Sequence, residues 1–101
     1  MKFNLSEGYI MSKTIQVFED AGHGWAKVPI SELKSLGIKN QITSFSYVKD
    51  GFAYLEENKD FGTYLKVLKE SEPNLSLKFE HDYYDGQSEI RTYKRYNKNK
   101  L

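Results

Sequence analysis

The sequence contains no cysteine and only two prolines among its 101 residues. Without cysteine there is no disulfide, no thiol catalysis and no cysteine-ligated zinc or iron–sulfur site, so we expect a reducing cytoplasm as the compartment. An excess of one charge is also lacking, because 15 Lys and Arg oppose 14 Asp and Glu, for a formal net charge of +1. Such a protein has no global field that draws it to nucleic acid or anionic lipid, and any electrostatic targeting must be local.

Long apolar runs are lacking too, whereas aromatic residues are abundant. The chain never has 18 consecutive apolar residues, so we expect no membrane-spanning helix and no membrane partner. Residues 1–10 carry one Lys and no apolar run of seven, which is not the pattern of a signal peptide. Eight Tyr, six Phe and one Trp can fill the single modest core that a chain of this length builds.

The predicted domain organisation is a flexible leader at 1–13, a single α+β domain at 14–97 and a frayed basic tail at 98–101. Met11 offers a second translation start, because Glu7-Gly8 can be encoded by purine-rich codons just upstream, where a bacterial ribosome-binding sequence would lie. Two hypotheses stay open. Either translation begins at Met11 and residues 1–10 are a translated leader, or these residues are an ordinary N-terminal tail.

Two short turn signals predict the first two hairpins. The run Asp-Ala-Gly-His-Gly at 20–24 joins the alternating strand 14–19 to a returning strand that ends near Pro29. Asp50-Gly51 joins the strand-like runs on either side of it, and a two-residue loop there places Tyr47 opposite Tyr54.

A third turn signal, Asp85-Gly86, predicts a hairpin between strands at 75–83 and 88–96. Its register is open by a step or two, because a two-residue loop pairs Glu80 with Arg91 but also Asp82 with Glu89. The first of these strands alternates cleanly, and the pattern places His81 on its apolar side as a hydrogen-bonded core histidine.

Two helices separate the hairpins. Ser31 is the predicted N-cap of a short helix at 31–36, which Gly37 ends. Asp60 is the predicted cap of a longer helix whose apolar stripe is Phe61, Tyr64, Leu65 and Leu68. The fold class that follows is α+β: a six-stranded, mainly antiparallel sheet of three hairpins in the order ββαββαββ, with both helices packed mainly on one face. Closure of the six strands into a barrel is the alternative.

The opening turn admits two interpretations. Asp20 and His23 could form an acid–base pair beside Trp25, or Asp20 could start a tight turn while Trp25 fills the core. We favour the turn, because no nucleophile is fixed nearby and no hydrolase motif occurs. His23, His81 and their neighbouring aspartates lack the spacing of a metal motif. We therefore predict no catalytic residue, no metal site and no cofactor, and expect the protein not to be an enzyme.

The basic end of the chain is the strongest local charge feature. Residues 91–100 carry five basic side chains and two tyrosines without an acid, which suits an acidic protein groove or nucleic-acid phosphates and bases. A solvated final strand that protects a sheet edge is the alternative. The middle hairpin is expected to present aromatic side chains on an open sheet face. The predicted partner-binding residues are Arg91, Tyr93, Lys94, Arg95, Tyr96, His23, Tyr47 and Tyr54.

A resemblance adds a biological setting. The motif Asp-Ala-Gly-His-Gly-Trp at 20–25 and the later Ala-Tyr-Leu-Glu-Glu at 53–57 resemble those of a group of small phage- and plasmid-borne accessory proteins. The likeness covers residues 18 to 68 and carries over no catalytic residue. Small proteins of mobile elements are often inhibitors of host defence, of the anti-CRISPR or antirestriction type, so this resemblance implies such a role in the cytoplasm of a bacterial host.

Three function classes are therefore expected, in this order. The first is a non-enzymatic inhibitor that binds a host defence protein complex, such as a nuclease, since acidic residues at 56–72 and the basic end make the molecule bipolar. The second is a nucleic-acid-binding accessory protein that uses the aromatic sheet face and the basic strand. The third is a hydrolase built on His23.

Overall fold

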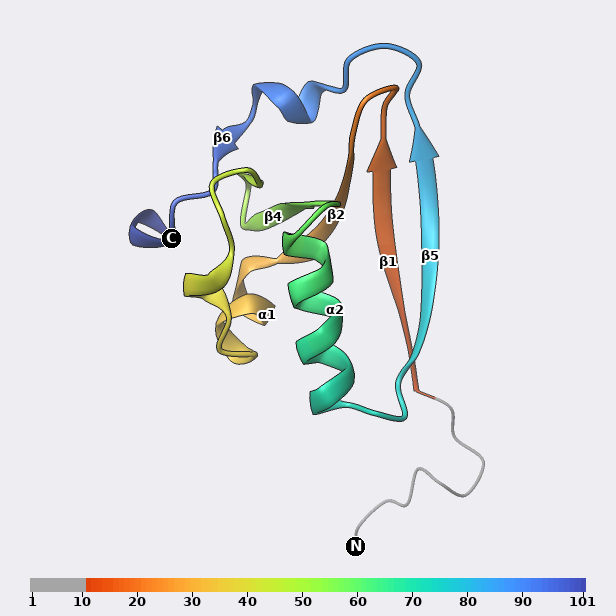
Figure 1. Cartoon of the computed structure of the whole chain (residues 1–101), viewed down its shortest axis with the longest axis vertical. Coiled ribbons are helices and arrows are strands. Elements are labelled where there is room, and N and C mark those ends of the chain that lie inside the picture. The colour runs from red at the N-terminus through yellow and green to blue at the C-terminus, as the bar shows by residue number, and fades with distance from the viewer. Residues whose placement is uncertain (1–10) are drawn as a thin grey trace, which may run out of the picture.

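The computed structural model describes residues 11–101, and the question of the translation start lies outside these residues (Figure 1). The first strand begins at Ser12, inside the segment that was predicted to be a leader. The tail predicted to fray forms a 3-10 turn, and Leu101 packs against the core. The elements in chain order are β1 (Ser12–Glu19), β2 (Gly24–Pro29), α1 (Ile30–Ser35), η1 (Lys39–Gln41), β3 (Tyr47–Lys49), β4 (Phe52–Glu56), α2 (Asp60–Ser71), β5 (Ser76–Tyr83), η2 (Glu89–Thr92), β6 (Lys94–Arg95) and η3 (Lys98–Lys100).

One six-stranded sheet organises the domain, with strand order β5-β1-β2-β4-β3-β6. All neighbouring strands are antiparallel except β1 and β5, which run parallel over the whole of both strands. The predicted α+β class with six mainly antiparallel strands and two helices is confirmed. The sheet is open, with β5 and β6 as its edges, so the alternative of a closed barrel is wrong.

The first two hairpins are confirmed. β1 pairs with β2 around the turn at 20–23, and Phe18 lies opposite Trp25. β3 pairs with β4 in the predicted register, with Tyr47 opposite Tyr54. Asp50 and Gly51 both take positive φ, of 52° and 85°, which is the geometry that a two-residue hairpin loop requires.

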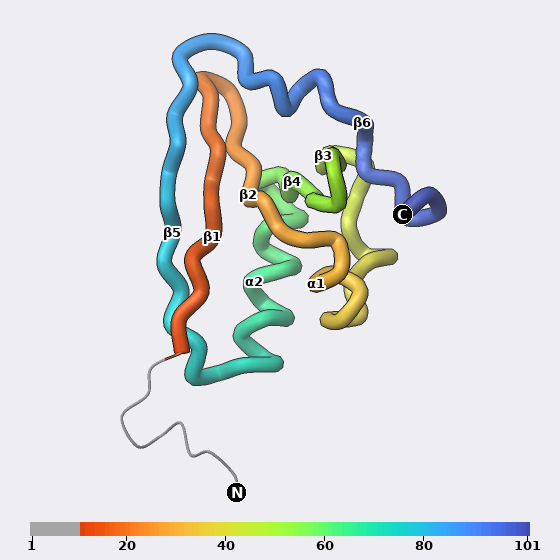
Figure 2. The backbone as a smooth tube through the Cα atoms, turned by 180° about the vertical axis from the view of Figure 1, so that it is seen from behind, coloured from red at the N-terminus to blue at the C-terminus, as the bar shows by residue number. Residues whose placement is uncertain are grey.

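The prediction of a third hairpin is wrong. β5 pairs in parallel with β1, and the chain then crosses the end of the sheet to reach β6, which adds two residues beside β3 (Figure 2). The crossing segment forms η2 in place of a strand, because Ile90 is buried among aromatic side chains and Arg91 binds Asp20. These long-range contacts outweigh a hairpin whose predicted register set Asp82 against Glu89.

The side chains that cap the two helices are not the ones predicted from the sequence. Ser31 lies inside α1, and the N-cap Pro29 makes no side-chain capping bond. Asp60 is the first residue of α2, while Oε1 of Glu56 accepts the amides of Lys59 and Asp60 at 2.7 and 2.9 Å. A carboxylate at this end of a helix also opposes the positive end of its dipole. Gly37 ends α1 as expected, with φ of 74°.

The carboxylate of Asp60 instead organises the loop that leads to β3. It is fully buried and accepts hydrogen bonds from Thr43 N, Thr43 Oγ1 and Ser46 Oγ, the last at 2.6 Å. Ser46 Oγ in turn accepts the amide of Glu56 at 3.0 Å. A buried charge is tolerated when it is fully hydrogen-bonded in this way, and the network fixes the loop against the start of α2.

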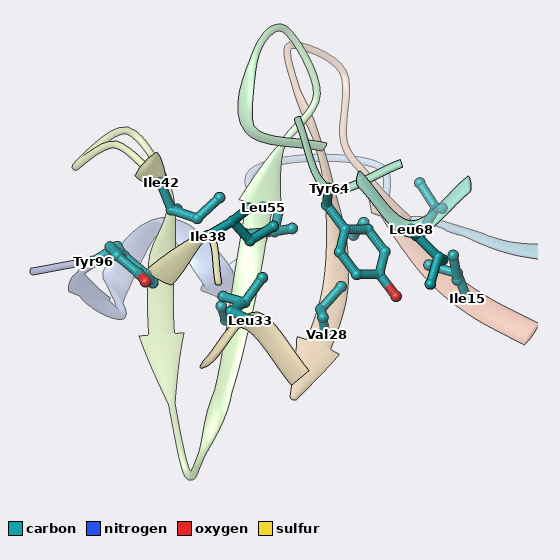
Figure 3. Packing of buried hydrophobic residues seen from close by; sticks show 12 residues of the cluster. Ile15, Val28, Leu33, Ile38, Ile42, Leu55, Tyr64, Leu68 and Tyr96 are labelled. Atoms are coloured by element: carbon teal, nitrogen blue, oxygen red, sulfur yellow. The ribbon is translucent and has the colours of Figure 1, made fainter. Parts of the chain in front are cut away.

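The main core lies between the sheet and the two helices. Leu33 from α1 and Tyr64 and Leu68 from α2 pack on Ile15, Val28 and Leu55 of the sheet, and the predicted stripe of α2 is confirmed (Figure 3). The hydroxyl of Tyr64 donates to Glu32 at 2.6 Å, and Glu32 also pairs with Lys13 of β1 at 3.0 Å. Burial raises the pKa of Tyr64 far above its usual range, so the hydroxyl stays protonated as a donor. Both helices are therefore fastened to one face of the sheet.

Candidate partner-binding surface

The opening turn is closed by the carboxylate of Asp20. Its Oδ1 accepts the amides of Gly22 and His23 at 3.0 and 2.9 Å, which is the turn geometry that the sequence predicts. Its Oδ2 accepts the amide of Ser88 at 2.9 Å. Arg91 then closes over both oxygens, with Nε at 2.7 Å from Oδ2 and Nη2 at 2.9 Å from Oδ1. Five donors therefore surround one buried carboxylate.

This environment fixes the charge state of Asp20. The guanidinium of Arg91 and then the backbone amides hold the pKa of Asp20 well below its usual range, and the same contact raises the pKa of Arg91. The ionised form of Asp20 is thus favoured, and both of its oxygens already accept hydrogen bonds. The imidazole of His23 is exposed and packs against Trp25, with ring centroids 6.0 Å apart. It is the backbone of His23, through its amide, that binds Asp20.

Trp25 is a core side chain, as the turn interpretation expects. It is 3% exposed and belongs to a second cluster on the sheet face opposite the helices, with Tyr47, Tyr54 and Ile90. The guanidinium of Arg91 lies 5.5 Å from the Trp25 ring, in cation–π contact. Arg91 therefore joins the turn, the tryptophan and the crossing segment, and this structural role is one that the sequence did not reveal.

The aromatic face of the middle hairpin is covered. Tyr47 and Tyr54 are only 9% and 8% exposed, because the crossing segment lays Ile90 and Tyr93 over them. The rings of Tyr54 and Tyr93 meet edge to face with centroids 5.1 Å apart. Tyr93 donates to Glu89 at 2.8 Å, and burial together with this bond raises its pKa to about 12. The expectation that this face lies open is therefore wrong.

Tyr96 is also buried, on the other face. It is 2% exposed within the main core, and its hydroxyl donates to the carbonyl of Lys39 at 2.6 Å. Burial raises its pKa to about 12. Its backbone amide donates to the carbonyl of Ser46 at 2.8 Å, which holds the end of β6 beside the loop before β3. The side chain therefore anchors the C-terminal segment.

The C-terminal segment and Lys49 at the end of β3 together expose a group of cations, here called the basic edge. Lys94 and Lys100 line two hollows of about 640 and 600 Å³, and Asp50 also lines the second hollow. Within residues 11–101, none of these cations forms an ion pair. The basic edge consists of Lys49, Lys94, Arg95, Lys98 and Lys100.

Phe45 stands beside the basic edge and is 68% exposed, the most of any large apolar side chain among the described residues. Arg95 donates to the carbonyl of the preceding Ser44 at 3.2 Å and covers the ring of Tyr47 at 4.8 Å. Aromatic residues, including phenylalanine, and arginine are both enriched in protein interfaces. Phe45 was absent from the sequence-based set of binding residues, and only its exposure identifies it.

His81 lies on an exposed strand and not in the core, so that prediction is wrong. Its Nδ1 is 3.2 Å from Glu19, and the His81 side chain is more than half exposed. The alternating pattern led to the wrong prediction because β5 is an edge strand on which nearly all side chains are exposed, so neither of its faces is buried. Within residues 11–101, His, Asp and Glu side chains do not gather in any group of three or more that could hold a metal ion. In the same residues, no helix has the length and apolar character to cross a membrane.

Comparisons of the chain with family models, with curated proteins and with solved structures found no match.

Proposed function

We propose that this protein is a non-enzymatic inhibitor that acts in the bacterial cytoplasm by binding a host defence nuclease complex through the basic edge and Phe45. The observation that carries the binding surface is the exposed group of cations beside an exposed phenylalanine. The class of target is supported by the resemblance of the motifs at 20–25 and 53–57 to those of mobile-element accessory proteins. An acidic groove is the partner surface that complements such an edge.

Burial of the aromatic sheet face favours a protein partner over nucleic acid. Single-stranded nucleic acid is held by exposed rings on which successive bases stack, together with cations along the backbone. Tyr47, Tyr54 and Tyr96 are buried and Tyr93 is half-buried, so among residues 11–101 Phe45 alone is left as a freely exposed ring beside the cations. One ring and a patch of cations suit a protein anchor better than a stacking platform.

Hydrogen bonding at Asp20 favours a binding role over catalysis. A histidine general base is oriented by a carboxylate that accepts from its ring, but the oxygens of Asp20 already accept from five backbone and arginine donors. Its pKa is held low, so it is also a poor proton acceptor. The motif at 20–25 thus has a complete structural explanation.

The test is affinity capture from the bacterial host with mass spectrometry of what is retained. The variant Lys94→Glu with Arg95→Glu reverses two exposed charges of the basic edge, and Phe45→Ser removes the exposed ring. Lys66→Glu with Lys69→Glu is the matched control, because these exposed lysines lie on α2, away from the basic edge. We expect wild type and control to retain a defence nuclease, and the basic-edge and Phe45 variants to lose it.

Two outcomes would overturn the proposal. Retention of the nuclease by the basic-edge variant, with an unchanged circular dichroism spectrum, would place the contact elsewhere. Submicromolar binding of the wild type to random duplex or single-stranded DNA at about 150 mM salt would instead support the nucleic-acid function, since phosphate contacts weaken steeply with salt and only a dedicated site survives it.

A further inference from the structure

The outer edge of β5 is long and unprotected. The strand has eight residues without proline, and it pairs with β1 in an unbroken register, so it carries no bulge. No described residue pairs with its other side, since β5 is the first strand in the sheet order. Figures 1 and 2 show β1 and β5 as a long arm beside α2. Such an edge is a template for another strand.

Backbone geometry restricts which strand can add there. Ser76 N donates to Met11 O at 2.9 Å and Tyr84 N donates to Glu19 O at 2.8 Å, so the even-numbered amides of β5 face β1. Because these groups alternate along a strand, the amides and carbonyls of Leu77, Phe79 and His81 face outward. In an antiparallel pair, an outward-facing residue must lie opposite another outward-facing residue. Two copies of β5 can therefore pair only about a two-fold axis that passes through a residue.

Charge then selects the residue on the axis. With Phe79 on the axis, Lys78 of each copy lies opposite Glu80 of the other, and Phe79 meets Phe79. With Glu80 on the axis, Lys78 lies opposite Asp82, but the two Glu80 carboxylates oppose each other. Axes at Lys78 or His81 likewise set like charges opposite one another, and like charges in directly opposed positions are destabilising. The Phe79 axis is the long register that combines two favourable ion pairs with no repulsion.

The side chains that this register joins lack partners within one copy. Lys78 and Glu80 lie beside the neutral Thr14 and Gln16 of β1, so neither has an ion pair within the described residues. Phe79 packs against Phe61 at 6.0 Å between ring centroids yet stays 42% exposed. A second Phe79 would cover that exposed part.

A groove beside α2 fits Tyr83, the other exposed aromatic side chain of β5. Leu65 and Lys69 of α2 face Leu75, Leu77 and Phe79 across a hollow of about 460 Å³. In the Phe79 register, Tyr83 of the second copy lies opposite Leu75, on the same face of the sheet as this groove. Tyr83 is 60% exposed in the single chain. The two-fold axis thus directs both exposed rings of β5 toward apolar surface of the other copy.

From these observations we propose that two copies of the chain associate through antiparallel β5 strands, with Phe79 on the two-fold axis, to form one continuous twelve-stranded sheet. The interface is one strand per copy and lies at the small end of protein interfaces, so we expect a weak dimer that is populated between about micromolar and millimolar chain concentrations. It leaves β6 and the basic edge free at the two far ends of the sheet. The inference does not rest on the proposed function.

The test uses charge exchange within the interface. Lys78→Glu replaces both ion pairs with opposed carboxylates, and Glu80→Lys replaces both with opposed ammonium groups, so each variant should raise the dimer dissociation constant by about tenfold or more. The double variant Lys78→Glu with Glu80→Lys restores opposite charges and should recover the wild-type constant. An equimolar mixture of the two single variants should form a heterodimer for the same reason. Sedimentation equilibrium of the full chain, of 11.8 kDa, measures each constant.

Several outcomes would overturn the proposal. A wild type that stays monomeric up to about millimolar chain concentration, where even a weak interface would be populated, has no such interface. A dimer that both single variants leave unchanged uses another surface. Single variants that dissociate without recovery in the double variant would rule out the pairing of Lys78 with Glu80. A dimer that Lys78→Glu weakens and Glu80→Lys leaves unchanged would indicate the register with Glu80 on the axis. Circular dichroism checks that each variant is folded, and Lys66→Glu serves as a charge control on α2.

Discussion

The two edge strands of the sheet, β5 and β6, differ in how many unpaired backbone groups they offer to another strand. β6 has only two residues, both of them exposed cations, and the chain leaves the sheet directly after them. β5 has eight residues and an unbroken row of outward-facing backbone groups. A short edge with charged side chains disfavours pairing with another strand, whereas a long, regular edge can pair with one through its backbone. β6 is therefore suited to binding a partner through its side chains, and β5 to binding one through backbone hydrogen bonds.

The supporting contacts of the two edges differ as well. β6 is held by long-range anchors, because Tyr96 enters the main core and the preceding segment places Ile90 in the aromatic cluster. β5 is held mainly by its ladder to β1, and none of its side chains is fully buried. A substitution that disrupts the aromatic cluster should therefore destabilise β6 before it affects β5.

The largest expected effect comes from Trp25→Ala, which removes the centre of the aromatic cluster beneath the crossing segment. We expect a loss of about 3 to 5 kcal/mol in the free energy of unfolding, the range for truncating a buried large aromatic side chain. Urea denaturation measures it. His23→Ala, two residues earlier, should change stability by less than about 0.5 kcal/mol, because its side chain is exposed. Equal losses in the two variants would mean that His23 is itself structural.

A smaller effect is expected from Asp20→Asn, which removes the charge that fastens the crossing segment, and hence β6, to the opening turn. Leaving the guanidinium of Arg91 without its carboxylate should lower the melting temperature by about 10 °C at pH 7. The pKa of Asp20 is depressed in the folded state, so its contribution is fully present above the unfolded value of 3.8 and declines as the pH falls below it.

The pH dependence makes this prediction specific. The difference in melting temperature between wild type and Asp20→Asn should be constant from pH 7 to 5 and should shrink from about pH 4 to 3. Thermal unfolding followed by circular dichroism across this range provides the measurement. A difference that stays constant down to pH 3 would show that the variant acts through lost hydrogen-bond geometry and not through the charge of Asp20.

The difference between local turn signals and long-range contacts explains how much of the fold the sequence could predict. Turns signalled by adjacent residues were located correctly, since Asp50-Gly51 fixes the β3–β4 register and the run at 20–24 fixes the first hairpin. Asp85-Gly86 carries an equally strong local signal, yet the chain does not form a hairpin there. The contact that decides it joins Arg91 to Asp20, and a pattern of local residues holds no information about it.

The candidate site shows the same division. Lys94, Arg95, Lys98 and Lys100 are exposed, as their charge predicts, because burying them unpaired would be costly. Arg91 is partly buried and paired with Asp20. The tyrosines interleaved with these basic residues could not be assigned from sequence, since an amphipathic ring suits a surface anchor and a core equally well. Tyr96 and Tyr47 prove to be core residues, while Phe45, one residue before the buried Ser46, is exposed. Only the packing of β6 against β3 distinguishes them.

The smallest expected effect concerns His81→Pro, which tests the direction of the backbone groups on the β5 edge. The amide of His81 faces outward and makes no bond to β1, so proline should cost about 1 kcal/mol or less in the stability of the monomer. His81→Thr is the matched control, because it also removes the imidazole that pairs with Glu19 but keeps the amide. Urea denaturation at low chain concentration compares the two variants.

A loss of several kcal/mol in the proline variant alone would show that the amide of residue 81 bonds to β1, and the register argument for pairing at the edge would then be wrong. If the two variants are equally stable, sedimentation should find the dimer retained in His81→Thr and lost in His81→Pro, because only the proline removes a hydrogen-bond donor from the edge and places its ring there.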